Sequence, residues 1–232
     1  MATDSKSFLD WLARWEQDLP EVRLEEIVSD PHQVALVSVD LTRGFCCEGP
    51  LASPRVAGII PAAVRLFQRA HDLGVRHFLL LHDTHDADAL EFSAYPPHAI
   101  AGTAESELVD ELKALPFSDR FVVIPKNSVS CDIGTDLGPW LEAHPAVSTF
   151  IVVGDCTDIC VYLAAMYLRL RANVFRLRGV RVVVPADCVQ TYDMPVQVAE
   201  ELGGLPHDGD LLHRVFLYHM ALNGIEVVGH LA

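Results

Sequence analysis

Apolar and polar positions along this 232-residue chain follow two recurring patterns. Short, continuous, β-branched runs predict buried strands, and longer segments with a helical period of apolar residues separate them. Continuous apolar strands joined by helices are typical of a parallel sheet that helices cover on both faces. We therefore expect a three-layer α/β/α fold with a single sheet. The strand runs are Val34–Val39, His77–Leu81, Phe121–Ile124, Phe150–Val153 and Val180–Val184.

The helical pattern predicts crossover helices between these strands and a last helix that precedes a possible edge strand after Gly224. A separate helical pattern over residues 5–17 lies outside this alternation. We therefore expect a helical extension over residues 1–30, with packing on the domain surface as its simplest role, and one α/β domain over residues 31–232. The crossover helices are Arg55–Leu73, Glu105–Ala114 and Asp158–Arg171, the last helix is Asp210–Asn223, and the edge strand is Ile225–Val228.

Composition restricts the partners of such a domain. Hydrophobic residues make up 50% of the chain, which suffices for a full core. The formal net charge of -15 disfavours nucleic acid and anionic membranes, which bind clustered Lys and Arg. No apolar run approaches the roughly 20 residues of a membrane span, and the N-terminus lacks a signal-peptide pattern. We expect a cytoplasmic protein that acts on a small molecule, with no nucleic-acid or membrane partner.

The six cysteines are too few for a disulfide scaffold, and no two have CxxC spacing. Most, such as Cys131 and Cys188, are expected to be small buried hydrophobic residues. Cys160 differs, because the segment 154–160 follows a strand and leads into a helix. The unpaired N–H groups and the positive dipole at a helix start lower a thiol pKa. Cys160 is therefore the leading candidate for a nucleophile.

Ligands of open α/β sheets bind beyond the carboxyl ends of the strands. Asp40 and Lys126 end two of the other predicted strands, and so they join Cys160 at this edge. A cysteine nucleophile needs a proton acceptor, a positive neighbour and donors for the oxyanion. Asp40 and Lys126 supply the first two, and the backbone N–H groups of Cys156 and Cys160 are candidate oxyanion donors. Singly, the Asp fits a helix cap and the Lys a solvated surface residue; their coincidence at one edge favours catalysis.

A second polar cluster follows the predicted strand His77–Leu81. Asp83 and His85 are two residues apart, so an extended loop directs both side chains to one side. The loop can return Glu91 and His98 to them. Two imidazoles and carboxylate oxygens suit one divalent metal ion, with Zn²⁺, Fe²⁺ and Mn²⁺ as the candidates. A solvated acidic loop with unconnected histidines is the alternative interpretation.

These residues resemble a known family. Asp40, Lys126 and the Gly-x-x-Thr-Asp-x-Cys segment at 154–160 resemble the Asp–Lys–Cys triad of the isochorismatase-like cysteine hydrolases. Asp83-x-His85 and the Tyr-Pro-Pro-His run at 95–98 resemble the metal loop of its nicotinamidase branch. The resemblance covers about residues 34–189 and implies a Rossmann-like three-layer fold. It also implies hydrolysis of nicotinamide to nicotinate and ammonia through a thioester on the cysteine.

In that scheme Asp40 is the general base and then the acid, Lys126 stabilises charge, and one divalent metal ion orients the pyridine ring. The resemblance further implies a cis peptide at Asp155–Cys156 that turns the Cys156 N–H toward the oxyanion. It implies aromatic packing on the ring by Phe45 and Tyr95, and a homodimer or homotetramer.

The chain departs from the family pattern near the pocket. Tyr95 stands where tryptophan is usual, and Glu91 where many relatives have a third histidine. The family commonly has Gln and then Asn or Asp after the catalytic aspartate, whereas Leu41–Gly44 separate Asp40 from Phe45 here. Two alternatives therefore stay open: another small-amide or N-carbamoyl amidohydrolase of the same superfamily, and a catalytically silent binding domain with this fold.

Overall fold

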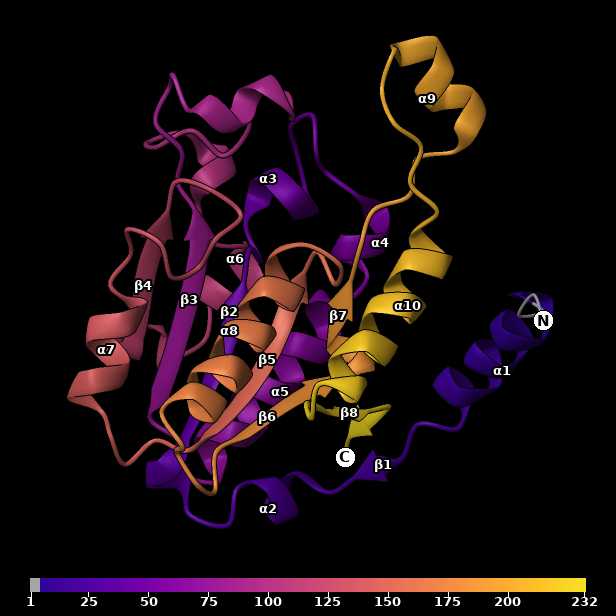
Figure 1. Cartoon of the computed structure of the whole chain (residues 1–232). Coiled ribbons are helices and arrows are strands. Elements are labelled where there is room, and N and C mark those ends of the chain that lie inside the picture. Colours follow the sequence, from indigo (N-terminus) through magenta and orange to yellow (C-terminus); the bar gives the residue numbers. More distant parts are fainter. Residues whose placement is uncertain (1–4) are drawn as a thin grey trace.

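The computed structural model describes residues 5–232, and the first four residues of the expected N-terminal extension lie outside this range. One seven-stranded sheet forms its centre, in the order β4-β3-β2-β5-β6-β8, and β7 pairs with the end of β5 (Figure 1). Every strand pair in this sheet is parallel. Its strands are β2 Val34–Val39, β3 His77–Asp83, β4 Phe121–Lys126, β5 Thr149–Asp155, β6 Arg181–Pro185, β7 Val189–Gln190 and β8 Glu226–Val228.

Helices cover both faces of the sheet, as predicted, because alternate residues of each strand point to opposite faces. On β2 and β3, Leu36 and Leu80 belong to one apolar cluster, with α5 and α6, and Val37 and Leu79 belong to the other, with α7, α8 and α10. The helices are α1 Ser5–Gln17, α2 Leu24–Ile27, α3 Arg43–Cys46, α4 Pro54–Ala57, α5 Ile60–Asp72, α6 Asp110–Lys113, α7 Leu137–Ala143, α8 Cys160–Val174, α9 Val196–Leu202 and α10 Gly209–Leu222.

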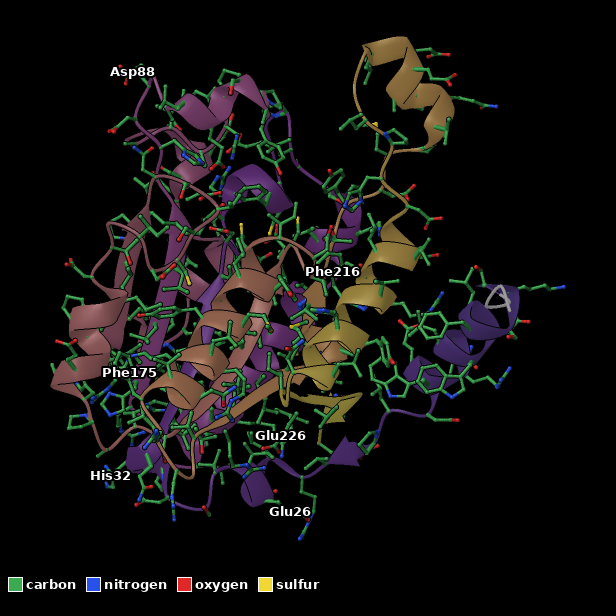
Figure 2. All side chains as sticks on the ribbon, in the orientation of Figure 1. Glu26, His32, Asp88, Phe175, Phe216 and Glu226 are labelled. Carbon is green, nitrogen blue, oxygen red and sulfur yellow. The ribbon has the colours of Figure 1, made fainter. Side chains whose placement is uncertain are left out.

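Short elements complete the chain. A small parallel pair joins β1 Glu21–Val22 to β9 His230–Leu231, so the segment after α1 lies against the C-terminal end of the chain. At the sheet edge, Glu226 of β8 accepts two hydrogen bonds from the Arg181 guanidinium of β6, at 2.8 and 2.7 Å (Figure 2). Five 3₁₀ turns are η1 Pro31–Gln33, η2 Leu90–Ser93, η3 Ala104–Ser106, η4 Ser118–Arg120 and η5 Ala186–Cys188.

All five predicted strand runs and the edge strand are confirmed, but two predicted helices are wrong in detail. The predicted helix Arg55–Leu73 is divided into α4 and α5, because Pro61 lacks an N–H and suits a first helical turn, where a new helix begins. The predicted helix Glu105–Ala114 holds only η3 and the short α6. Its middle is extended, because Leu108 pairs with Thr42 in a β-bridge, which takes the backbone groups that a helix needs.

The helical pattern over residues 5–17 is confirmed as α1, which lies beside α10 in Figure 1. Trp11 and Trp15 each meet the Tyr218 ring of α10 edge-on, at 5.4 and 5.6 Å between centroids. Glu16 accepts a hydrogen bond from Arg214 at 2.6 Å. This helix therefore packs on the domain surface. Within residues 5–232, no helix combines the length and apolar character needed to cross a membrane.

Candidate active site

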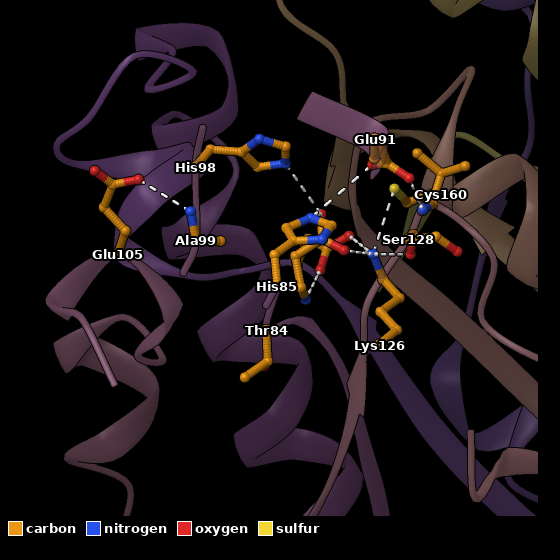
Figure 3. Close-up of polar contacts among 12 residues, drawn as sticks. Thr84, His85, Glu91, His98, Ala99, Glu105, Lys126, Ser128 and Cys160 are labelled. Atoms are coloured by element: carbon orange, nitrogen blue, oxygen red, sulfur yellow. Dashed lines mark hydrogen bonds and ion pairs between the residues drawn. The ribbon is translucent and has the colours of Figure 1, made fainter. Parts of the chain in front are cut away.

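The carboxyl ends of three neighbouring strands and the start of one helix converge on a single buried point (Figure 3). Asp40 follows β2, Asp83 ends β3, Lys126 ends β4 and Cys160 is the first residue of α8. All four side chains are buried. The structure therefore brings Asp40, Lys126 and Cys160 together at the sheet edge where the sequence predicted them.

Lys126 lies at the centre of this group. Its ammonium Nζ is 2.8 Å from Asp40 Oδ2 and 3.6 Å from Cys160 Sγ, and it also pairs with Asp83. Burial by itself lowers a lysine pKa, but attraction by Asp40, Cys160 and Asp83 outweighs it and raises the pKa of Lys126 well above its usual value. These effects favour the ammonium form of Lys126, which lies within reach of the sulfur.

Asp40 is held in an uncommon backbone conformation, with φ of 51°, which an aspartate tolerates better than most residues. The Asp83 backbone N–H donates a hydrogen bond to Asp40 Oδ1 at 2.7 Å. Burial, and then the negative charge of Asp83, raise the pKa of Asp40 to about 6, against the opposing effect of Lys126. A carboxylate with this pKa suits both proton uptake and proton delivery near neutral pH.

The expectation of a lowered pKa for Cys160 is wrong. The residue does begin α8, but it is buried, and burial raises its pKa well above the usual value. Lys126 lowers the pKa, while the negative charges of Asp40 and Asp83 raise it further. One carboxylate oxygen of each aspartate and the Cys160 sulfur all lie within 4.8 Å of one another. These effects favour the protonated thiol, and two carboxylates lie close enough to accept its proton.

The turn before Cys160 depends on close backbone approach. Gly154 has φ of 118°, and a Cβ there would lie 1.9 Å from the Val39 carbonyl oxygen, so only glycine fits. The Asp155–Cys156 peptide is cis, as the resemblance implied. Cys131 and Cys188 are buried as predicted, and none of the cysteines that the structure describes forms a disulfide.

The second predicted cluster also assembles. Asp83 Oδ2 is 3.5 Å from His85 Nε2 and 3.7 Å from His98 Nε2, and Glu91 Oε1 is 3.9 Å from His85 Nε2. The two imidazoles and the Asp83 carboxylate are buried. Two backbone hydrogen bonds bring distant parts of the loop together. The His85 N–H donates to the Ala99 carbonyl, and the Ala101 N–H donates to the His85 carbonyl.

The chemistry of these donors fits a divalent cation. Within residues 5–232, neither His85 nitrogen nor Glu91 Oε1 has a hydrogen-bond partner, although all three atoms are buried. His98 Nδ1 is 2.8 Å from the Pro96 carbonyl oxygen, to which it donates, so its Nε2 lone pair is free to face Asp83. Unpaired buried nitrogens and oxygens that converge at this spacing are costly without a cation between them.

Asp83 belongs to both clusters, a connection that sequence reasoning missed. One carboxylate oxygen pairs with Lys126 and the other faces the two histidines. Burial opposes the charge, but the positive charge of Lys126 lowers the pKa of Asp83 below its usual value. No local pattern shows this link, because β3 and β4 are paired through residues 43 positions apart.

Three aromatic rings lie close to the His98 ring. The Phe45 and Tyr95 rings lie 5.5 and 6.2 Å from its ring, centroid to centroid. Phe92 lies 5.7 Å from His98 and 5.4 Å from His85, and sequence reasoning did not single it out. The sequence feature that could have identified Phe92 is its position directly after Glu91 in the polar loop. His82 of β3 is also buried, and burial is the chief cause that lowers its pKa to about 4.

Comparison with known proteins agrees with this geometry. Residues 34–201 match the family model described as the isochorismatase domain. The chain belongs to the isochorismatase family. The expected family and the parallel α/β fold are therefore confirmed.

Relatives of this family member include amide hydrolases. The chain is 30% identical over 221 residues to Nicotinamidase 1 of Arabidopsis thaliana, with 89% of each chain covered. The structure of the pyrazinamidase/nicotinamidase of Streptococcus mutans is similar, with a TM-score of 0.64 and 25% identity. The match covers 84% of this chain and 99% of the Streptococcus chain. The zinc complex of the Pyrococcus horikoshii pyrazinamidase shares the fold, with a TM-score of 0.65, 23% identity, and 84% and 98% coverage.

Proposed function

We propose that this isochorismatase-family hydrolase is a nicotinamidase, which converts nicotinamide to nicotinate and ammonia. The observation that carries the proposal is the Lys126 ammonium, buried between Asp40 and Asp83 and 3.6 Å from the Cys160 sulfur. Nucleophile, base and cation are thus already in contact, beside a buried set of imidazole and carboxylate donors. The likeness to the Arabidopsis nicotinamidase supports nicotinamide as the substrate.

In the first half of the reaction, Asp40 takes the Cys160 thiol proton and the sulfur attacks the carboxamide carbon. A C–S bond forms, and the carbonyl π electrons move to oxygen. The Cys156 and Cys160 backbone N–H groups are the proposed donors to this oxyanion. Cys160 begins α8, where first-turn N–H groups lack intrahelical partners, and Cys156 lies in the turn before it. The C–N bond then breaks, Asp40 returns its proton to the leaving nitrogen, and ammonia departs.

In the second half, Asp40 takes a proton from water, which attacks the thioester carbon. The C–S bond breaks, Asp40 returns its proton to the Cys160 sulfur, and the product acid gives its carboxyl proton to solvent and leaves as nicotinate. Lys126 remains protonated throughout, because its pKa is raised well above the usual value. Its charge favours the thiolate as it forms and holds Asp40 in position, 2.8 Å away.

Asp83, His85, Glu91 and His98 are the proposed ligands of one divalent metal ion, with zinc, iron or manganese as candidates. When bound, such an ion supplies a Lewis-acid contact for the pyridine nitrogen and thereby orients the ring. Phe45 and Tyr95 are proposed to pack on that ring. The division of the chain at residue 30, a cytoplasmic location and a homodimer or homotetramer remain predictions.

The direct test measures ammonia release from nicotinamide, pyrazinamide and N-carbamoyl amides, with elemental analysis of the same sample. We expect the highest kcat/KM for nicotinamide or pyrazinamide and about one transition metal ion per chain. Preference for an N-carbamoyl amide would favour the alternative amidohydrolase. No turnover of any amide by metal-loaded protein would refute the proposed function.

A further inference from the structure

A histidine outside the predicted site is bound to the turn that carries the nucleophile. His207 Nε2 lies 2.8 Å from Asp158 Oδ2, and Asp158 is two residues before Cys160. Both side chains are largely buried, with 9% and 7% of their areas exposed. Burial opposes the charge, but the hydrogen bond from His207 leads the effects that keep the pKa of Asp158 below its usual value.

The second ring nitrogen of His207 also faces an acceptor. Its Nδ1 lies 3.0 Å from the Tyr192 carbonyl oxygen, and the Tyr192 ring is stacked on the imidazole at 3.8 Å and 20°. A carbonyl oxygen and a carboxylate oxygen both accept, so both ring nitrogens must donate. That arrangement describes an imidazolium, which is charged and bound at both ends.

The acceptors themselves are fixed. A Cβ at Gly209 would lie 2.5 Å from the Tyr192 carbonyl oxygen, so the first turn of α10 packs closely against this carbonyl. Thr157, next to Asp158, receives support from both sides: its N–H donates to the Gln190 carbonyl at 3.0 Å, and its hydroxyl lies 2.8 Å from His213 Nδ1.

His207 also closes an arm, defined as residues 194–207, that stands clear of the body of the molecule in Figure 1. Its two ends, Met194 and His207, form an antiparallel bridge in which each N–H donates to the other's carbonyl at 2.8 Å. Farther out, Val196 of α9 and Leu205 are exposed by 57% and 87%. The imidazole therefore connects the base of the arm to the turn that carries Cys160.

We propose that His207 is a positioning residue for Cys160, acting as a cation clamped between the Asp158 carboxylate and the Tyr192 carbonyl. Without it, a buried negative charge two residues from the nucleophile loses its counter-charge, and the turn has one side-chain anchor fewer. A shift of the turn moves the sulfur away from Lys126 and the attacked carbon, and a misplacement of about 1 Å can cost about 100-fold in rate. This inference rests on the proposed function for its kinetic readout only.

The experiment compares His207→Ala, His207→Gln and Asp158→Asn in a Cys47→Ser background, which removes the exposed thiol. We expect His207→Ala to lower kcat about 100-fold with little change in KM for nicotinamide. His207→Gln, which keeps a donor toward Asp158, should recover at least part of that loss. Far-UV circular dichroism and thermal melting verify folding; if His207→Ala fails to fold, His207→Gln and Asp158→Asn decide the result.

A second readout needs no substrate: the rate at which iodoacetamide alkylates Cys160, followed by tandem mass spectrometry. We expect slower alkylation in His207→Ala, because the sulfur loses its contact with Lys126. The matched control is His230→Ala, which breaks another histidine–aspartate pair, with Asp187 at 2.6 Å, away from the nucleophile turn.

Unchanged kcat and alkylation in folded His207→Ala, or an equal loss in His230→Ala, would overturn the positioning role. An inactive wild-type protein whose Cys160 alkylation still depends on His207 would instead refute the nicotinamidase proposal alone.

Discussion

The two sides of the Asp83 carboxylate differ in how completely protein atoms satisfy them. Toward β4, one oxygen pairs with Lys126, which also pairs with Asp40. Toward the polar loop, the other oxygen faces His85 and His98, whose Nε2 atoms are 3.5 and 3.7 Å away. On the first side the protein supplies a cation, Lys126, whereas on the second side Asp83 faces two imidazoles. We infer that the nucleophile group is preorganised by folding and that the imidazole group is completed by a cation.

The largest expected effect comes from removing the sulfur. Cys160→Ala should lower ammonia release by at least about 10³-fold, because no other group forms the thioester. Metal content and fold should be unchanged, since the substitution leaves the imidazole side intact. Stopped-time ammonia assays and elemental analysis measure both. The matched control, Cys188→Ala, removes another buried thiol outside the site. Substantial turnover by Cys160→Ala would contradict the nucleophile assignment.

Removing the shared cation should damage stability as well as activity. Lys126→Met leaves Asp40 and Asp83 buried without their partner, and breaking a buried ion pair in this way costs about 3–5 kcal/mol. Urea unfolding gives the free energy of unfolding. Lys113→Met is the control, because Lys113 pairs with Glu107 at 2.6 Å on the exposed surface and its loss should change little. An equal loss of unfolding free energy in the two variants would show that the buried Lys126 ion pairs do not stabilise this edge of the sheet.

The imidazole side can be weakened alone. His98→Ala removes one proposed ligand, and we expect metal affinity to fall by more than the roughly 10–100-fold that the loss of an outer-shell partner causes. KM for pyridine carboxamides should rise, while the rate of Cys160 alkylation should change little. Metal titration and steady-state kinetics measure these effects. His71→Ala, a histidine stacked on Phe117 outside the site, is the control. An unchanged KM and an unchanged metal content would show that His98 binds neither the metal ion nor the substrate.

The smallest effect concerns protonation of the base. Because burial raises the pKa of Asp40 to about 6, the carboxylate is ionised above that pH and protonated below it. The base must be ionised, so kcat/KM should rise with pH through about 6 and fall about tenfold per unit below it. A pH profile of kcat/KM, with Asp40→Asn as the inactive control, measures this limb. A flat profile down to pH 4.5 would show that another group accepts the proton.

The pattern of the sequence by itself determined the strands, the parallel sheet and the edge where chemistry gathers. Buried parallel strands are continuous apolar runs, and their carboxyl ends lie on one edge whatever the loops do. Asp40, Lys126 and Cys160 could therefore be placed together from their positions after such runs. Asp83 at the end of β3 and the loop residues His85, Glu91 and His98 could be predicted from residue type and spacing.

Only the tertiary structure decided the direction in which the pKa of Cys160 shifts. A pKa depends on every charge and apolar atom around the group, and here the effect of burial outweighs that of the helix N-terminus. It also decided the double role of Asp83 and the contact of His207 with Asp158. These contacts join residues 43 and 49 positions apart. Long-range contacts of this kind arise from how strands and loops pack, which no local period of apolar residues records.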